Sequence, residues 1–452
     1  MRNMNGSSQS RHVKKQNTIT RILSITDRGS RYQQIARIAR ANGGIGKIGI
    51  LGRTFWCISD ETLLRRLLLD TRSHVRKGNI VYLLERILGH SIFTAEGNEW
   101  NELSYSSKQT LGNTNSRRYH GRMIEVTNRW IDSIWRQSED SAKLDLRRDL
   151  YYLNMDIISA VLLGCILPGD TRTLICSEHE WIRATVNRRL ASSMLAPAWI
   201  PSLSFLQIYL RKKKIDNLLS PVVSRAKQMK NEFGHCLISD HDNEMQRKTL
   251  CPFSKVQNTD FVKTLFFTGI RTTAVTLEWI ILYMVTLPTE LEMIRTEIDE
   301  HIGSGAPSPE GIAKLVHMER FIKEVMRRAP LAHTHVRQVK QGFRYGDHFL
   351  RRGDVLLLSV FGFNHDEKVW DEPDSFNPDR FYEKGVAALL FPFGLGTHTC
   401  PGQHLAYQSI TIALVLLIQR FRIEKVESVQ LEPCSFVLLE PSNIQSVKLV
   451  PR

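Results

Sequence analysis

The stretch Phe391-Pro-Phe-Gly-Leu-Gly-Thr-His-Thr-Cys-Pro-Gly402 decides the fold, and an apolar run from Gln403 to about Arg420 follows it directly. Gly394 and Gly396 allow the backbone angles that a tight loop needs. The pattern therefore predicts a loop that presents Cys400 at the start of a helix. The helix dipole and the free backbone N–H groups there favour a thiolate over a thiol, and a thiolate is a soft ligand for iron.

Two other interpretations of this loop remain open from the residues alone. His398, Cys400 and His404 would form part of a zinc site, although the chain lacks a second cluster at zinc-finger spacing. Alternatively, Cys400 is a structural cysteine that is buried after a turn. Motifs elsewhere in the chain are needed to distinguish a zinc ligand, a structural cysteine and an iron ligand at Cys400.

The pattern Phe393-x-x-Gly396-x-His398-x-Cys400-x-Gly402 closely resembles the haem-thiolate loop of the cytochrome P-450 family. The resemblance implies that Cys400 is the axial ligand of the iron of haem b and that Phe393 packs against the thiolate side. It also places His398 at the position that binds a haem propionate, where arginine is more usual.

Composition is consistent with one large globular domain. The chain has 452 residues and a formal net charge of +15, which favours an acidic protein or an anionic membrane surface as a partner. We find no nucleic-acid motif, so nucleic acid is not expected as a partner. The seven cysteines are scattered and odd in number, which argues against a disulfide framework and for a reducing compartment.

The N-terminal segment 1–30 is expected to be a disordered basic tail, with a mitochondrial address as the alternative. We assign residues 31–452 to a single haem-thiolate domain. No run of eighteen or more apolar residues exists, so no transmembrane anchor is expected in this chain. The expected location is cytoplasmic, either soluble or attached to the membrane periphery, and an anchor upstream of this chain stays open.

The order of predicted elements matches the start of the cytochrome P-450 fold. Residues 31–42 have the apolar spacing of a short helix, and 47–51 and 54–58 are predicted strands. A helix is predicted over 60–70, and residues 71–96 are interpreted as a mixed loop. The predicted fold class is mainly α, with a small β-rich part near the N-terminus and between 337 and 361.

Gly97-Asn-Glu-Trp100 is expected to open the next helix. In the resembled family, a tryptophan here is followed four residues later by an arginine that holds a haem propionate. Trp100 is present, but the arginine position is Ser104. Lys108 lies one further turn along the same helix face and would substitute, or it is a solvated surface lysine.

The predicted helix Asp260–Leu287 has the centre Thr268-Gly-Ile-Arg-Thr-Thr273, where the family carries Ala/Gly-Gly-x-Asp/Glu-Thr-Thr/Ser. The resemblance implies that Gly269 leaves room for oxygen and substrate beside the iron. It also implies that Thr272 hydrogen-bonds to dioxygen, because a threonine inside a helix can bond to the carbonyl four residues earlier and loosen the ladder.

Arg271 occupies the position of the acid that usually relays protons, and a guanidinium cannot shuttle protons. Two interpretations stay open. A buried arginine needs a partner, so Arg271 would point away into a salt bridge. Alternatively, it faces the pocket and grips a substrate carboxylate in a two-pronged pair, as in some cytochrome P-450 peroxygenases, which usually lack the threonine that this chain retains.

The segment 324–381 resembles two further family motifs. Glu324-Val-Met-Arg327 resembles the Glu-x-x-Arg motif, and Phe376-Asn-Pro-Asp-Arg380-Phe381 resembles the Phe-x-Pro-x-Arg-Phe motif. The resemblance implies that Glu324, Arg327 and Arg380 form a structural ionic triad. It also assigns Arg337 to a haem propionate.

The expected function is a haem-thiolate monooxygenase that oxidises a lipophilic small molecule, such as a terpenoid, a fatty acid or another secondary metabolite. The chain carries no flavin or nicotinamide fingerprint, so an acidic ferredoxin or a flavoprotein reductase is the expected electron donor. Residues 195–210, followed by the basic run 211–214, predict either a lipid-contacting surface or a substrate-roof loop. A peroxide-using peroxygenase or rearrangement enzyme and a non-catalytic haem sensor are the alternatives.

Overall fold

The computed structural model describes residues 30–50, 52–69, 74–78, 80–89, 91–136, 141–195, 203–228, 232–240, 255–426, 429–435 and 437–452. The expected N-terminal tail lies outside the described residues, apart from Ser30. Residues 196–202 of the predicted segment 195–210 also lie outside the described residues, whereas residues 203–210 are helical.

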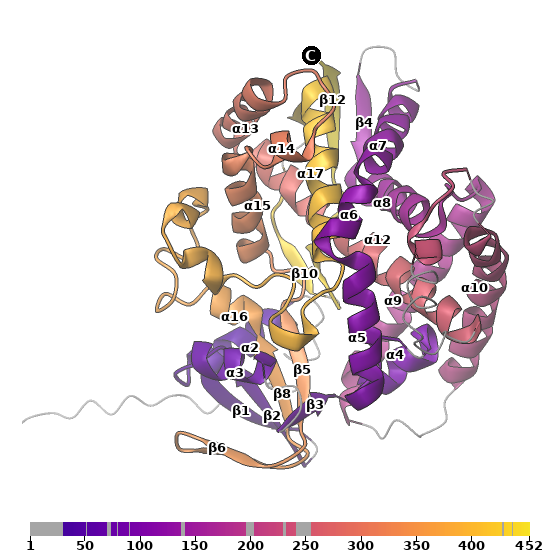
Figure 1. Cartoon of the computed structure of the whole chain (residues 1–452). Coiled ribbons are helices and arrows are strands. Elements are labelled where there is room, and N and C mark those ends of the chain that lie inside the picture. Colours follow the sequence, from indigo (N-terminus) through magenta and orange to yellow (C-terminus); the bar gives the residue numbers. More distant parts are fainter. Residues whose placement is uncertain are drawn as a thin grey trace, which may run out of the picture.

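The described chain is mainly helical, as the sequence predicts (Figure 1). Its α-helices are α2 (Arg31–Arg40), α3 (Glu61–Leu69), α4 (Ile80–Leu88), α5 (Gly97–Leu111), α6 (Asn113–Arg118), α7 (His120–Trp135), α8 (Leu146–Leu163), α9 (Gly169–Leu195), α10 (Leu203–Lys227), α12 (Lys255–Thr286), α13 (Pro288–His301), α14 (Pro309–Ile312), α15 (Val316–Arg328), α16 (Val360–Asn364) and α17 (Gln403–Arg420).

The strands form one five-stranded sheet, in the order β1-β2-β8-β5-β3, and three smaller sheets. They are β1 (Ile45–Ile50), β2 (Arg53–Ile58), β3 (Val75–Lys77), β4 (Ala142–Asp145), β5 (Thr334–Val339), β6 (Phe343–Tyr345), β7 (His348–Leu350), β8 (Val355–Ser359), β9 (Phe421–Lys425), β10 (Pro433–Ser435), β11 (Leu439–Pro441) and β12 (Ser446–Pro451). The large sheet, with α2 and α3, forms the lower lobe in Figure 1.

The sequence-based prediction was wrong for residues 71–96, which hold β3 and α4 rather than a loop. β3 has three residues and pairs with β5, so its strand signal is too short to recognise without its partner. The predicted elements over 31–42, 47–51, 54–58 and 60–70 are confirmed within a few residues at their ends. The small β-rich part is confirmed as well.

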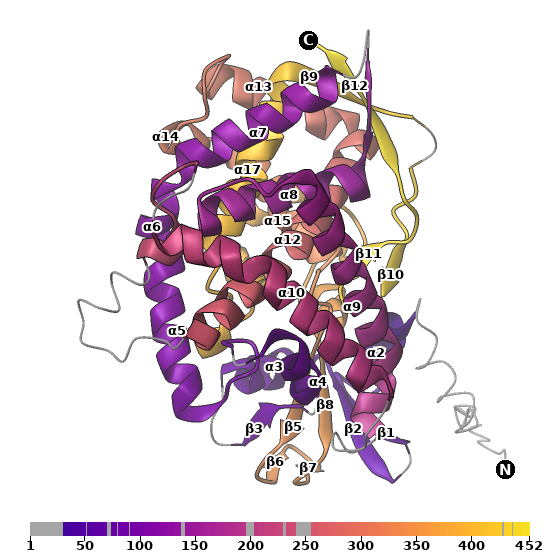
Figure 2. The ribbon, with the colours of Figure 1, turned by 90° about the vertical axis from the view of Figure 1, so that its right-hand side faces the viewer.

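The helix α12 runs through the middle of the helical part and packs most closely against α8. Both helices contribute to a main apolar core that also includes α7, α15 and α17. In Figure 2, α10 crosses the face of the molecule in front of α12. The stretch Asp260–Thr286 is long and apolar enough to cross a membrane, with a mean hydropathy of 1.4, but 78% of the residues in that apolar stretch are buried inside the protein. This burial is what a core helix shows.

Candidate haem-thiolate site

The cysteine loop has the shape that its glycines predict. Gly394 and Gly396 have φ values of +83° and +72°, which residues with a side chain rarely adopt. The backbone N–H of Cys400 donates to the Phe393 carbonyl at 2.8 Å and closes the loop. A side chain on Gly396 would meet Leu69 at 2.9 Å, so the loop lies close against α3.

Cys400 lies two residues before Gly402, which is the N-cap of α17, and its side chain is exposed. Burial of the surrounding region raises the pKa of the Cys400 thiol, and a hydrogen bond from the Gly402 backbone opposes this shift. The preference of the helix start for a thiolate stays a prediction for the haem-loaded protein. A coordinating metal ion removes a thiol proton outright, so the accessible sulfur still suits an iron ligand.

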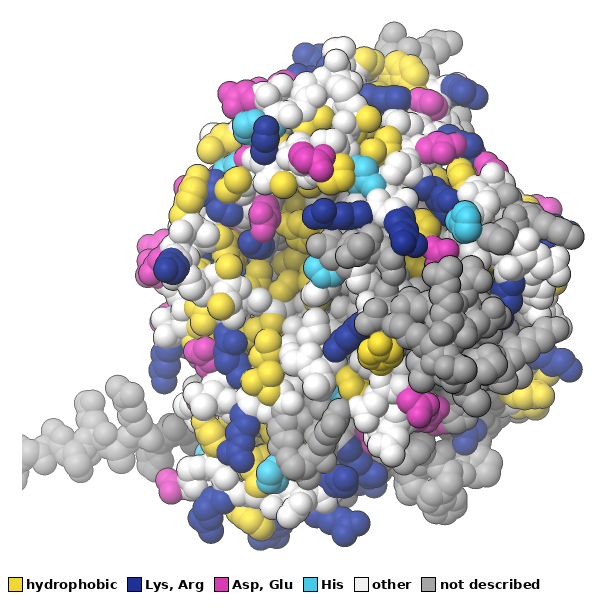
Figure 3. All heavy atoms as spheres, in the orientation of Figure 1, with side chains coloured by type: hydrophobic (Ala, Val, Ile, Leu, Met, Phe, Trp, Pro, Cys, Tyr) yellow, Lys and Arg dark blue, Asp and Glu magenta, His cyan; other side chains and the backbone are white. Residues whose placement is uncertain are grey.

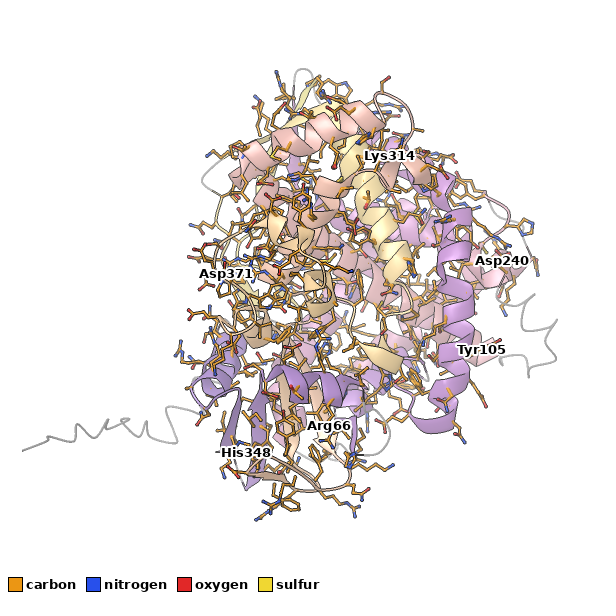
Figure 4. All side chains as sticks on the ribbon, turned by 60° about the vertical axis from the view of Figure 1, so that its left-hand side comes forward. Arg66, Tyr105, Asp240, Lys314, His348 and Asp371 are labelled. Atoms are coloured by element: carbon orange, nitrogen blue, oxygen red, sulfur yellow. The ribbon has the colours of Figure 1, made fainter. Side chains whose placement is uncertain are left out.

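His398 packs edge-on against Trp100 of α5, with ring centroids 4.3 Å apart. Trp100 is buried, and so is Ser104 one turn later. Lys108, one further turn along α5, is exposed, as is Tyr105 (Figure 4). An exposed position agrees with a solvated surface lysine, and a contact between Lys108 and a haem propionate stays a prediction.

Arg337 and Lys77 lie opposite each other on β5 and β3. Burial lowers the pKa of both side chains, that of Lys77 to about 8. The Lys77 ammonium donates to the carbonyls of Ile92, Phe93 and Ala95 at 2.8–3.1 Å. Arg337 donates to the Val336 carbonyl at 3.0 Å.

Two desolvated cations side by side call for an anion, and a guanidinium binds a carboxylate through two parallel hydrogen bonds. The Arg337 guanidinium therefore fits a propionate carboxylate of a haem, whereas the three protons of the Lys77 ammonium are already donated to carbonyls. Sequence reasoning missed Lys77 because β3 was interpreted as loop. Its only signal was a basic residue in a short segment, Val75-Arg-Lys, which has no strand periodicity.

The centre of α12 exposes one stripe of side chains and buries the rest. Leu265, Thr268, Gly269, Thr272 and Thr276 are half-buried, while the remaining residues from Phe261 to Val285 are buried. This spacing corresponds to a single face of a helix. The face carries no charged side chain, and it is the part of α12 between Phe261 and Val285 that neighbouring described residues cover least.

Gly269 has a packing role that the resemblance does not imply. A Cβ on Gly269 would meet Ile158 of α8 at 3.2 Å. The missing side chain therefore lets α8 and α12 approach closely. An additional effect on access to the iron stays a prediction.

Arg271 lies on another side of α12, where it is buried in a salt bridge. Its Nε and Nη2 donate to both carboxylate oxygens of Glu440 on β11, at 3.3 and 2.6 Å. Glu180 of α9 lies 3.4 Å from Nη1, and Arg183 of α9 contacts Glu440 as well. The structure agrees with the interpretation of Arg271 as a structural salt bridge, and not with a clamp for a substrate carboxylate.

The predicted ionic triad is confirmed. Arg327 donates two hydrogen bonds of 2.8 Å to Glu324, and Arg380 donates to the same carboxylate at 3.2 Å. Glu324 and Arg327 are completely buried. Arg327 also donates to the carbonyls of Asn364 and Pro373, so the triad holds α15 against the segment that leads to the cysteine loop.

The zinc interpretation finds no support in the described part of the chain. No group of three or more histidine, cysteine, aspartate and glutamate side chains is placed there to hold a metal ion. A haem-thiolate site needs only one protein side chain as iron ligand, and Cys400 is the candidate for it.

Comparisons with known proteins agree with this geometry. The family profile of cytochrome P450 matches residues 17–447. A cytokinin hydroxylase of Arabidopsis thaliana is 23% identical over 87% of this chain and 79% of its own length. An isoflavone 2'-hydroxylase of Glycyrrhiza echinata is 24% identical over 85% of this chain and 78% of its own. The Arabidopsis thaliana protein LUTEIN DEFICIENT 5, chloroplastic, is 23% identical over 84% of this chain and 67% of its own length.

A mainly helical fold with an accessible cysteine before a core helix defines a haem-thiolate protein. The chain belongs to the cytochrome P450 family, and it is a monooxygenase-type oxidoreductase with haem b as its cofactor.

Proposed function

We propose that this cytochrome P450 inserts one oxygen atom of O₂ into a neutral, lipophilic small molecule, with electrons from a separate redox protein. The uncharged stripe on α12 carries this proposal, because Leu265, Thr268, Gly269, Thr272 and Thr276 offer a substrate no ionic partner. The names of the relatives that act on cytokinin and isoflavone indicate hydroxylation of ring-containing compounds by those proteins. A terpenoid or another secondary metabolite fits this surface.

When bound, the haem supplies the chemistry of dioxygen activation, which the protein alone lacks. Cys400 would hold the iron, and Arg337 would hold a propionate. His398 and Trp100 would pack at the edge of the same site, and Phe393 would lie beside the sulfur. Thr272, whose hydroxyl donates to the Thr268 carbonyl at 2.6 Å, would position protons for the reaction.

The peroxygenase alternative gains no support from Arg271. Its guanidinium is engaged by Glu440 and Glu180, so it is not placed as a clamp for a substrate carboxylate. Thr272, which such peroxygenases usually lack, is present on the half-exposed face. The same threonine speaks against a non-catalytic haem sensor.

We further propose an acidic ferredoxin or a flavoprotein reductase as the electron donor. The net charge of +15 favours an acidic partner. Lys and Arg side chains are distributed over the face drawn in Figure 3, with several along its lower edge.

A peripheral contact with a membrane is proposed for α10. Leu206, Tyr209 and Leu210 are 55–60% exposed, and the half-buried Lys212 and the exposed Lys213 follow them. Exposed apolar side chains beside cations suit an anionic lipid surface. This contact fits a cytoplasmic protein that is soluble or attached to the membrane periphery.

An optical titration followed by turnover tests the proposed function. Purified haem protein is mixed with a neutral terpene or with a long-chain carboxylic acid, and the Soret band is followed. We expect a low-to-high-spin shift with the neutral lipophile and product only with dioxygen and a reductase. Product from peroxide alone, or a shift with acids only that is lost in Arg271→Ala, would contradict the proposal.

A further inference from the structure

The two faces of the large sheet are covered by different helices. Helix α2 packs on one face, in an apolar cluster that Val336 of β5 contacts. Helix α3 packs on the other face, where Leu356 and Leu358 of β8 are completely buried. Phe391 belongs to this second cluster, and Gly396 lies close against α3. The cysteine loop therefore lies on the α3 side of the sheet.

Two side chains of β5 point to the α3 side of the sheet without being fully covered there. Residues of a strand alternate between its faces, so His335 and Arg337 point away from the side of Val336. Their neighbours across the strand pair, Leu358 and Leu356, are completely buried, but His335 and Arg337 are only half-buried. His335 therefore borders the same space as Arg337, the candidate propionate ligand.

His335 lies between Arg337 and the central helix α12. Trp279 of α12 donates from Nε1 to the Leu439 carbonyl at 2.9 Å, and the Leu439 N–H donates to the Leu331 carbonyl at 3.0 Å. The chain that enters β5 is thus tied to α12 through β11. Residues two apart on a strand are separated by about 7 Å, so His335 precedes Arg337 by this distance toward α12. A small molecule bound between the haem and the α12 stripe would therefore lie near His335.

The imidazole of His335 has no hydrogen-bond partner among the described residues. Burial, together with the positive charges of Arg337 and His333, lowers the pKa of His335 to about 3. The ring is therefore neutral at physiological pH, with one N–H donor and one nitrogen that accepts. Because polar groups inside proteins are nearly always paired, this ring calls for a ligand with a matching group.

We propose that His335 is a specificity-determining residue that hydrogen-bonds to a neutral oxygen of the substrate, either a hydroxyl or a carbonyl. This inference rests on the proposed function and narrows its substrate class to lipophiles that carry such an oxygen. Thr268, Thr272 and Thr276 of the α12 stripe already donate their protons to backbone carbonyls, so they have none left for a substrate carbonyl. His335 adds the N–H donor that the stripe lacks.

A haem propionate is the other oxygen group expected on this side of the sheet. A carboxylate gains most from a charged donor, and the Arg337 guanidinium offers it two parallel N–H groups and a permanent charge. The neutral His335 ring offers one N–H group and no charge. It therefore suits a neutral oxygen better than a carboxylate.

Ligands that bind the haem iron through their own imidazole test the proposal without knowledge of the natural substrate. The probes are 1-alkylimidazoles and the matched 1-(ω-hydroxyalkyl)imidazoles, over a series of chain lengths. The shift of the Soret band gives the dissociation constant of each probe. The proteins are the haem-loaded wild type, His335→Leu, which removes both ring nitrogens, and His335→Gln, which keeps a donor and an acceptor. The control is His348→Leu on β7 (Figure 4), where the ring of His348 packs against Trp56.

The measured quantity is the affinity of each hydroxyl probe relative to its alkyl counterpart. We expect this relative affinity to fall about 2- to 12-fold in His335→Leu at one chain length, which is the effect of one hydrogen bond. His335→Gln should retain part of it, and His348→Leu should leave it unchanged. An equal relative affinity in the wild type and His335→Leu at every chain length overturns the proposal.

Haem transfer to an excess of apo-globin separates the substrate from the propionate. We expect His335→Leu to release haem as slowly as the wild type. Faster release, combined with an unchanged relative affinity of the probes, would assign the ring to a propionate and overturn the substrate contact. Turnover tests the proposed function separately. If the wild type gives no product with dioxygen and a reductase, that function fails, and the probes still decide whether His335 binds a neutral oxygen.

Discussion

Arg271 and Glu440 form a buried, two-pronged salt bridge between residues that are 169 positions apart in the sequence. The pair joins α12 to β11 and is 5% and 1% exposed, respectively. Glu180 and Arg183 of α9 complete the cluster with one further charge of each sign. The arginine that replaces an acid in α12 is thus compensated by carboxylates from two other elements.

Removing one member of this salt bridge should be costly, because the other charge stays buried without its partner. We expect Arg271→Met and Glu440→Gln each to lower the free energy of unfolding by about 3 kcal/mol. The double variant should lose about 1–3 kcal/mol less than the sum of the two, because the substitutions share one interaction. Urea unfolding of all four proteins measures this coupling.

The control for this cycle is the surface salt bridge between Arg129 and Glu125, in which both side chains are 48% exposed. Arg129→Met should change the stability by less than about 1 kcal/mol. Strict additivity of the Arg271 and Glu440 substitutions would contradict the buried interaction.

The Glu324 network should fix the geometry of the segment before the cysteine loop. Glu324→Gln leaves the buried Arg327 guanidinium without its carboxylate, so we expect a loss of about 3–5 kcal/mol in unfolding free energy. Haem retention should fall in parallel, because Arg327 also holds the carbonyls of Asn364 and Pro373. The matched control, Lys323→Met, breaks a partly exposed pair with Glu319 on the same helix. Equal effects of the two substitutions would argue against the network.

The motifs that can be recognised in sequence are those in which chemistry depends on consecutive residues. The loop around Cys400, the Glu324–Arg327 pair and the long apolar helix α12 all have such local signals, and each was predicted. Contacts between elements that are distant in the sequence have no such local signal. The partnership of Arg271 with Glu440 depends on how β11 is placed, and an isolated glutamate in a short strand does not predict it.

The same reasoning explains three features of the site that the sequence alone did not predict. Lys77 lies on a three-residue strand that exists because β5 pairs with it, so it could not be found from periodicity. The pKa of Cys400 depends on the balance between burial and one backbone donor, and burial is a property of the fold. Gly269 was recognised as special, but its packing against Ile158 required α8 to be placed.

Glu278 should make stability depend on pH. Burial raises its pKa from 4.5 to about 7, although Arg147 opposes the shift. Between these values the folded protein retains a proton that the unfolded chain loses, so this contribution to stability is complete below about pH 4.5 and is lost as the pH rises through about 7.

The Glu278→Gln variant removes this titration. Relative to wild type, it should gain about 3 kcal/mol in unfolding free energy between pH 4.5 and pH 8, which is the full size of the shift. Chemical unfolding at both pH values is the measurement, with Glu300→Gln as the exposed control on α13. A difference from wild type that stays constant with pH would contradict the raised pKa.

Arg337 should contribute to haem retention. Its guanidinium is desolvated and lies beside Lys77, so a propionate would gain a charge-assisted hydrogen bond worth about 1.5–3 kcal/mol. Arg337→Gln should therefore speed haem transfer to a large excess of an apo-globin by about 10–100-fold. Arg344→Gln, an exposed arginine on β6, is the control. If the two variants release haem at the same rate, Arg337 does not bind the propionate.

The Cys400 sulfur should ligate the haem iron as a thiolate. The most direct measurement is the difference spectrum of the dithionite-reduced protein with and without carbon monoxide, for wild type and Cys400→His. We predict that the wild type shows the red-shifted Soret band of a thiolate-ligated carbonyl haem and that the variant loses it. A wild-type band at the position of a histidine-ligated haem, or an unchanged red-shifted band in Cys400→His, would contradict the claim.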